Sequence, residues 1–308
     1  MKNFEEVYEK LCTNSKEKLE SEKNNYRKAS RKITMIIAII AIIITAICIM
    51  LMGKNSFVYV LPIALMVTVL IIFIIVNVKK NKYGVFYKNN VINEILENYE
   101  KNLKFDAKGG ITLGEYHEGF NDQSESISSE DLIYGTTENG IEIKMSQIRA
   151  THEEITTDGD GNTTTTTVTD YDGVYGIAKI NNSSKSNIII SKNSKFGRYK
   201  GERIELESAV FEKDYDVFSE DRLYAMKVFK PELIEEFSSL KEKEIKKFEA
   251  KIIKNTIYFR YRSGDIFKPP VRKDALDKEL IKSYVNTIET PLRLISSIDI
   301  SIKDSGVN

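Results

Sequence analysis

Two apolar segments separated by only four residues constrain the fold of this chain more than any other feature. Residues 33–52 read ITMIIAIIAIIITAICIMLM, and residues 57–78 read FVYVLPIALMVTVLIIFIIVNV. Each segment holds about 20 residues, enough for an α-helix to cross the roughly 30 Å hydrocarbon core of a bilayer. Neither contains Asp, Glu, Lys, Arg or His, the side chains that mark ion and proton pathways. The sequence therefore predicts a transmembrane helical hairpin over residues 33–78 that acts as an anchor.

Basic residues at the outer ends of the two segments predict how the hairpin is oriented. Four precede the first span and three follow the second: Arg27, Lys28, Arg31, Lys32, Lys79, Lys80 and Lys82. Because such flanks stay on the cytoplasmic side, we expect two spans in the cell membrane with both termini in the cytoplasm. The same seven side chains are our candidates for contact with the membrane surface. A cleaved signal peptide is the alternative, which the long, mixed-charge segment before the first span disfavours.

Composition differs between the two ends of the chain and suggests its organisation. The first 104 residues contain 16 Lys+Arg and 9 Asp+Glu, whereas the remainder contains 29 and 36. The acidic remainder is a poor surface for nucleic acid, so we expect no nucleic-acid partner. We expect four parts: a basic amphipathic helix (1–32), the hairpin (33–78), a juxtamembrane stalk helix (79–104) and a cytoplasmic domain (105–308). Apolar residues at helical spacing before and after the hairpin predict that the outer segments pair as a stalk.

The soluble part shows the short alternating patterns of strands, interrupted by a few helical patterns. Residues 140–157 and 162–171 alternate on either side of the turn sequence DGDGN, and residues 247–262 read as two strands joined at Lys254-Asn255. Pro231 is typical of a first helical turn, and residues 274–289 carry the apolar spacing of a closing helix. The predicted fold class is α+β: a two-helix transmembrane hairpin with a helical stalk, then mostly antiparallel strands with several packed helices.

An acidic stretch near residue 215 holds our candidates for a metal site. If residues 211–218 form a strand, Glu212, Asp214 and Asp216 share one of its faces, and Ser219 caps the next helix. Three carboxylates on one face are weak candidates for a divalent cation site. A solvated strand face explains the same pattern, and we favour it. We therefore expect no metal and no cofactor.

Motifs for catalysis are absent from the sequence. The two cysteines, Cys12 and Cys48, form no CxxC pair, and the only histidines are His117 and His152. The chain contains no GxSxG, no HExxH and no phosphate-cradling glycine loop. Active sites assembled from distant residues leave no motif, so an enzyme remains the third of our function classes.

Four stretches carry a resemblance to a known family: VINEILENYEKNLKFDAKGGITLGEYHEGF, SSEDLIYG, DGVYGIAKI and FEKDYDVFSEDRLYAMKVFKPELIEEFSSLKEK. In these stretches and in the order of its parts, the chain resembles the bacterial membrane protein family catalogued as domain of unknown function 3137. The last stretch is the most specific, because it joins an acidic strand to helices begun near Ser219 and Pro231. The family has no agreed activity, so the resemblance implies an architecture but no catalytic residue.

These observations favour a membrane-anchored cytoplasmic interaction or scaffold module. An anchor confines the domain to the membrane surface and raises its effective concentration for any partner there. The alternative is a membrane-tethered sensor that binds a small ligand or lipid in its β-rich domain. The expected partners are the lipid bilayer and another protein at the cytoplasmic face of the membrane, and homo-oligomerisation is left open.

Overall fold

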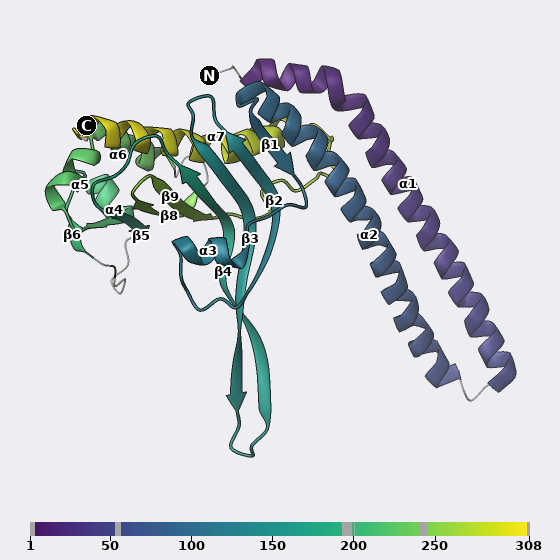
Figure 1. The fold of residues 1–308 in the computed structure, drawn as a ribbon. Helices are drawn as coiled ribbons and strands as arrows, with labels where there is room; N and C mark the ends of the chain where they lie inside the picture. The colour runs from purple at the N-terminus through teal and green to yellow at the C-terminus, as the bar shows by residue number, and fades with distance from the viewer. Residues whose placement is uncertain (1–3, 53–56, 193–198, 200, 241–244, 307–308) are drawn as a thin grey trace. The chain divides into compact units, whose positions relative to one another are not determined.

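The computed structural model describes residues 4–52, 57–192, 199, 201–240 and 245–306, which form two compact units. One unit comprises residues 8–91 and 268–277, and the other comprises residues 1–7, 92–267 and 278–308. Two long helices, α1 (Phe4–Met52) and α2 (Phe57–Tyr99), run side by side, and strands and shorter helices follow them (Figure 1). The predicted α+β fold class is confirmed. The connection predicted over residues 53–56 lies outside the described part of the chain.

The helices α1 and α2 pair in antiparallel fashion. Lys18 Nζ donates to Asn90 Oδ1 over 2.9 Å, and the rings of Tyr26 and Tyr83 stack with their centroids 5.6 Å apart. As the residue number rises along α1, the number of the residue that faces it in α2 therefore falls by the same amount. This register determines which side chains of the two helices stand at the same level.

The segment 268–277 packs against this helical pair. The Tyr87 hydroxyl donates to the carbonyl oxygen of Ala275 over 2.7 Å, and the Ala275 amide donates to Glu20 Oε1 over 2.6 Å. Tyr87 is fully buried, so these bonds are shielded from competing water. The segment thereby ties a late part of the chain to the first two helices.

The second unit is built around one sheet. The described residues form nine strands: β1 (Leu103–Asp106), β2 (Ser126–Thr136), β3 (Glu142–Thr157), β4 (Thr163–Lys179), β5 (Ile188–Lys192), β6 (Glu202–Ile204), β7 (Tyr215–Ser219), β8 (Lys246–Ile253) and β9 (Thr256–Arg262). Their order is β1-β2-β3-β4-β9-β8-β5-β7-β6, and every neighbouring pair is antiparallel. Both predicted hairpins, β3–β4 and β8–β9, are confirmed.

Helices cover both faces of the sheet. They are α3 (Leu113–Gly119), α4 (Ala209–Asp214), α5 (Arg222–Val228), α6 (Pro231–Ser239) and α7 (Lys278–Asp304). On one face, the Tyr175 hydroxyl of β4 donates to the carbonyl oxygen of Glu115 in α3 over 2.8 Å. On the other, Phe248 of β8 meets Phe237 of α6 edge to face with ring centroids 5.8 Å apart. Side chains that alternate along each strand thus enter two different layers.

The strands β3 and β4 continue beyond the rest of the sheet as a two-stranded arm (Figure 1). Every residue from 153 to 167 is exposed, and Thr157 pairs with Thr163 at its tip. The Asp158 carboxylate closes the turn by accepting from the amides of Asp160 and Asn162. The β-branched threonines suit an extended backbone, which accounts for an arm without a packed face.

Two local predictions around the acidic stretch are wrong. Residues 211–218 are not one strand, because α4 ends at Asp214 and β7 begins at Tyr215. The helix forms because the Ser208 side chain caps its first turn. The next helix, α5, is capped by Asp221, whose Oδ1 accepts from the Tyr224 amide over 2.9 Å, and not by Ser219, which ends β7.

The closing helix differs from its predicted range at both ends. It begins at Lys278 and continues through Pro291 to Asp304, although a proline removes one helical hydrogen bond. The carbonyl oxygen of Thr287, which an amide at position 291 would satisfy, accepts instead from the Tyr261 hydroxyl over 3.4 Å. A partner from β9 thus replaces the missing donor and lets the helix continue.

Candidate functional site

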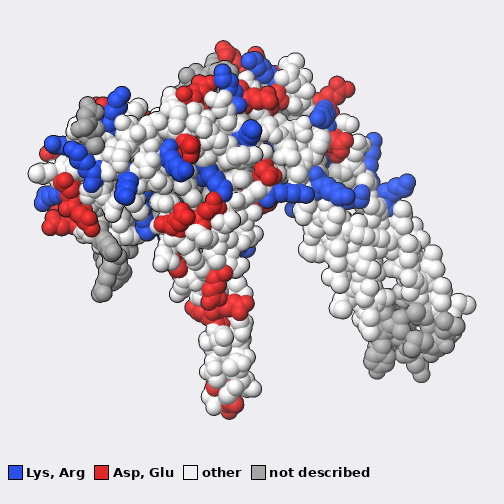
Figure 2. Space-filling view, viewed as in Figure 1, with Lys and Arg blue, Asp and Glu red and all other residues white. Residues whose placement is uncertain are grey.

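The seven basic residues predicted at the membrane surface gather at one level of the helical pair. Because Tyr26 stacks on Tyr83, residues 27–32 of α1 stand level with residues 77–82 of α2. At 1.5 Å of rise per residue, the cations from both helices fall within about 8 Å along the axis. Figure 2 shows Lys and Arg side chains gathered on the two helices beside their long uncharged part. We call these seven residues the cation belt: Arg27, Lys28, Arg31, Lys32, Lys79, Lys80 and Lys82.

Beyond the cation belt the two helices expose an apolar surface. Aliphatic and aromatic side chains point outward there, including Ile42 (70% exposed), Met66 (68%) and Phe73 (64%). Both helices are long and apolar enough to cross a membrane, by length and composition. An exposed apolar surface of this length is unfavourable in water, so it must be covered in the protein's native environment.

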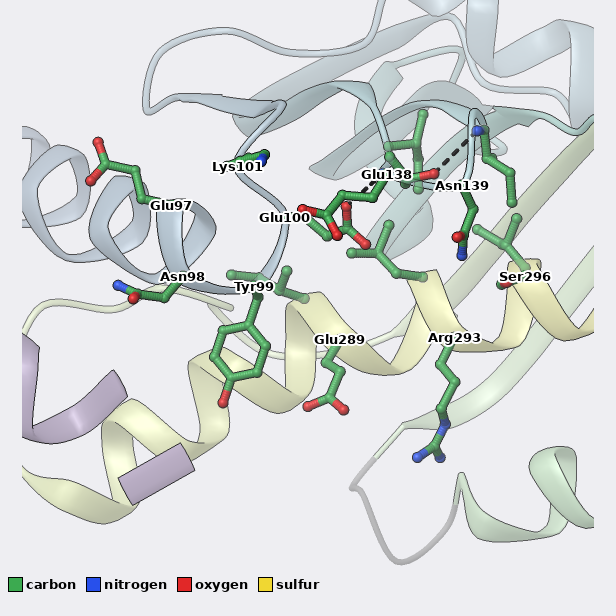
Figure 3. Close-up of a pocket in the computed structure, with 16 residues that line it drawn as sticks. Glu97, Asn98, Tyr99, Glu100, Lys101, Glu138, Asn139, Glu289, Arg293 and Ser296 are labelled. Carbon is green, nitrogen blue, oxygen red and sulfur yellow. Dashed lines mark hydrogen bonds between the residues drawn. The ribbon is translucent and has the colours of Figure 1, made fainter. Parts of the chain in front are cut away.

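A cavity of about 570 Å³ lies in the second unit, where α2 ends beside α7. We call it the α2–α7 cleft. One wall comes from residues 97–101, a second from the turn between β2 and β3, and the third from residues 288–296 of α7 (Figure 3). The floor is aliphatic and mostly buried, and it comprises Ile141, Ile143, Ile288, Leu292 and Ile295. A concave cavity of this size falls within the usual dimensions of a small-molecule site.

The rim of the α2–α7 cleft is predominantly acidic. Its charged residues are Glu97, Glu100, Lys101, Glu138, Glu289 and Arg293. Arg293 is already neutralised, because its Nε lies 2.9 Å from Glu236 Oε2. Burial and the nearby Glu289 carboxylate raise the pKa of the Tyr99 hydroxyl. In Figure 3 Glu289 and Arg293 project from the same side of α7, while Glu138 stands on the β2–β3 turn.

A second depression, of about 750 Å³, lies among α4, α5 and α6. We call it the α4–α6 groove. Six residues give it an apolar lining: Leu206, Val210, Met226, Phe229, Pro231 and Ile234. Val210 is 65% exposed and Met226 is 40% exposed, so the lining reaches the surface. Glu207 and Glu235 add negative charge to its edge. Exposed apolar lining with a charged edge is typical of a protein-binding surface.

The acidic stretch forms an ion-pair cluster around Arg203 of β6. The Arg203 guanidinium donates through Nε to Asp216 Oδ1 over 2.6 Å, and its Nη2 bonds to Glu212. The bond to Asp216 raises the pKa of the guanidinium, although burial opposes it. Asp214 ends α4, so the three carboxylates do not share one strand face. Across the described residues, no group of three or more His, Cys, Asp or Glu side chains is placed to hold a metal ion.

The two histidines do not meet at a common site. His152 lies at the base of the arm, where its Nδ1 is 2.8 Å from Asp170 Oδ1. This contact with Asp170, helped by Glu154, raises the pKa of the imidazole, although burial opposes it. His117 sits instead in α3. The imidazole of His152 therefore links β3 to β4 at the base of the arm, where the arm meets the sheet.

Sequence reasoning missed a cluster around Arg260 of β9. The guanidinium carbon stands 4.1 Å from the ring centroid of Phe120 and 4.8 Å from that of Tyr171. Its Nε donates to Glu249 Oε2 over 2.6 Å, and its Nη1 donates to the Tyr116 hydroxyl over 2.9 Å. Burial alone would lower the pKa of Arg260, but the Glu249 carboxylate and its other partners raise it. The alternation of β9 was the available signal, since it places Arg260 opposite the face of Phe259.

Two comparisons give no route to an activity. No curated protein matches this chain. Among solved structures, the crystal structure of the mycobacterial trehalose monomycolate transport factor A, TtfA, is similar to it with a TM-score of 0.39 and 7% identity. The similarity covers 65% of this chain and 87% of that one. A likeness at this level carries no argument about function.

A family comparison bears directly on the resemblance seen in the sequence. The match extends from β4 through the acidic stretch and almost to the end of α7. It therefore includes the most specific of the quoted stretches, which runs from Phe211 to Lys243. The resemblance is confirmed: residues 169–300 of this chain match the family described as protein of unknown function (DUF3137).

Proposed function

We propose that this chain is a membrane-anchored module that holds its α+β domain at the cytoplasmic face of the cell membrane, where the domain binds another protein. The observation that carries the proposal is the helical pair, with its exposed apolar surface beyond a belt of seven cations. The apolar surface suits the bilayer core, and the belt suits the anionic lipid of the cytoplasmic leaflet. Residues 105–308 then form the cytoplasmic part.

The α4–α6 groove is the surface that we assign to the protein partner. Its apolar lining would lose water on contact, and Glu207 and Glu235 would favour a partner with basic residues beside an apolar strip. The anchor contributes as well, because it restricts partner and domain to the same membrane surface. A sensor is the second candidate function, and the α2–α7 cleft favours it.

The orientation is tested by labelling single cysteines in the full chain, with Cys12 and Cys48 first replaced by serine. Asn55→Cys, between the spans, is expected to react with a membrane-impermeant maleimide in intact cells. Thr165→Cys, on the exposed arm, is expected to react only after the cells are permeabilised. Labelling of Thr165→Cys in intact cells would place the domain on the outer side. If alkaline carbonate released the protein from membranes, the proposal that the two apolar helices anchor it in the bilayer would be wrong.

The partner surface is tested with a photo-crosslinking side chain at Val210, compared with the same side chain at Ile155. The two positions are 65% and 69% exposed, but only Val210 lines the α4–α6 groove. We expect a discrete protein adduct from Val210 in intact cells and none from Ile155. Adducts from Ile155 alone would move the contact to the arm. Equal adducts from both positions would show that the groove has no special role.

A further inference from the structure

The segment 268–273 brings further cations to the helical pair, beside the cation belt. The Tyr83 hydroxyl of α2 donates to the carbonyl oxygen of Pro270 over 3.2 Å, and Tyr83 directly follows Lys82 of the belt. The segment and this part of the two helices belong to the same compact unit. We call residues 268–273 the basic strap, because it contains three cations and no acidic residue: Lys268, Arg272 and Lys273.

The basic strap is attached to the helices through its backbone. The Lys23 ammonium of α1, which is only 4% exposed, donates to the carbonyl oxygen of Lys273 over 2.8 Å. The bond from Tyr83 to Pro270 uses a carbonyl oxygen in the same way. Arg272 and Lys273 are exposed. The attachment therefore fixes the positions of these two cations without using their side chains.

Positive charge at this level of the molecule is not balanced by the protein. Acidic residues are absent from Lys23 to Met52 in α1 and from Phe57 to Asn93 in α2. Within the described part of the chain, the seven belt residues and the strap residues Arg272 and Lys273 form no ion pair. Like charges held this close together repel one another, so the site favours anions from outside the chain.

The apolar surface next to the cations indicates which anion fits. Met35, three residues after Lys32, is 61% exposed, and Val78, directly before Lys79, is 52% exposed. A soluble anion would neutralise the cations but leave this apolar surface in water. An amphiphile with a negatively charged headgroup satisfies both surfaces at once.

We propose that the basic strap and the cation belt together form a binding site for the headgroup of an anionic phospholipid. The inference rests on the proposed membrane anchor and deepens it, because it names the lipid class and adds a third segment to the two basic flanks. The strap lies nearly two hundred residues after the second span in the sequence, and only the fold brings it beside Lys82. It leads from β9 to α7, so a lipid bound there contacts the chain between two elements of the domain.

The test uses full-length protein that carries Phe73→Trp as its single tryptophan, since the chain has none of its own. Phe73 is 64% exposed on α2, six residues before Lys79, so the indole faces lipid close to the belt. The protein is reconstituted in vesicles of phosphatidylcholine with a fixed share of phosphatidylglycerol. In one set the phosphatidylglycerol carries bromine on its acyl chains, and in the other an equal share of phosphatidylcholine does.

Brominated chains quench tryptophan on contact, so the ratio of quenching in the two sets gives the preference for the anionic lipid. We expect phosphatidylglycerol to be preferred roughly tenfold, because several cations act on one headgroup. High salt is expected to reduce the preference by screening. Soluble glycerol phosphate in excess is expected to leave it unchanged.

Charge variants separate the strap from the belt. Arg272→Gln/Lys273→Gln is expected to lower the preference for phosphatidylglycerol about threefold or more and to leave quenching by brominated phosphatidylcholine unchanged. The fold is retained because both side chains are exposed and the strap is attached through its backbone. Arg222→Gln/Lys227→Gln is the matched control, since it removes the same two charges from exposed positions of α5. Its preference is expected to equal that of the Phe73→Trp protein.

Three results would overturn the lipid site. Equal quenching in the two vesicle sets would show that the cations select no lipid. An unchanged preference in Arg272→Gln/Lys273→Gln would show that the strap takes no part. Loss of the preference in glycerol phosphate would make a soluble anion the ligand. Absence of quenching by either brominated lipid would be a different failure, because it would show that α2 is not in the bilayer and would overturn the anchor itself.

Discussion

Replacing Phe237 with alanine is expected to lower the free energy of unfolding by about 3–5 kcal/mol. Phe237 is fully buried where α6 meets the sheet. Its ring centroid lies 5.6 Å from that of Phe211, 5.4 Å from Tyr215 and 5.8 Å from Phe248. The substitution removes apolar area from the core and leaves a cavity that rigid aromatic neighbours on several elements cannot close.

The measurement is denaturant unfolding of the full chain in detergent, followed by near-ultraviolet circular dichroism, which reports the packing of its tyrosines and phenylalanines. Leu223→Ala is the matched control, because Leu223 is 74% exposed on the neighbouring helix α5. We expect the control to shift the free energy of unfolding by no more than about 0.5 kcal/mol. A similar small shift for Phe237→Ala would show that the aromatic cluster does not support the folded domain.

The features predicted correctly from the sequence are those that local patterns of apolar residues and turn residues indicate. Uninterrupted apolar length identified α1 and α2, and period-two alternation with a turn sequence identified the β3–β4 and β8–β9 hairpins. Phe259 and Tyr261 alternate along β9 and are both buried. Each of these patterns depends on residues a few positions apart, so no knowledge of tertiary structure was needed.

The elements that were missed are short and depend on distant partners. The four-residue strand β1 was read as the end of the stalk helix, but its extended form is stabilised by pairing with β2. The helix α4 interrupts the predicted strand: Ser208 caps its first turn, and Glu212 within it forms an ion pair with Arg203 of β6. Elements this short have little intrinsic preference, so tertiary contacts decide their conformation.

The α2–α7 cleft was beyond prediction for a related reason. Glu97, Glu138 and Glu289 come from three segments, the first and last separated by nearly two hundred residues. Only the α7 residues Ile288, Leu292 and Ile295 show a local pattern, and this pattern predicts burial without revealing a cavity beside it. The acidic stretch drew attention in the sequence because its charges are adjacent, yet Arg203 compensates two of them.

Replacing Arg260 with methionine is expected to lower the free energy of unfolding by about 3 kcal/mol, because it leaves Glu249 as a partly buried charge without its partner. Glu249 faces Arg260 directly across the β8–β9 pair. This pairing continues the register that runs from the β8–β9 turn, and the irregularity at Lys247, which adopts a φ of 55°, shifts only the pairing beyond it, at Lys246. A shift of one residue would turn Glu249 to the opposite face of the sheet. Methionine keeps contact with Phe120 and Tyr171, so the loss reports charge more than volume.

A double-mutant cycle separates the ion pair from the other contacts of Arg260. Glu249→Gln alone is expected to destabilise the domain, and the double variant Arg260→Met/Glu249→Gln is expected to lose less than the sum of the two single changes, by about 1–3 kcal/mol. Arg260→Lys should fall between the unaltered protein and Arg260→Met, because lysine keeps the charge but lacks the planar group that bonds to Glu249 and Tyr116 together. Denaturant unfolding in detergent measures the free energy of unfolding of the unaltered protein and of the four variants. Strict additivity would show that Arg260 stabilises the domain through its aromatic neighbours. The Glu249 carboxylate would then contribute nothing through its contact with Arg260.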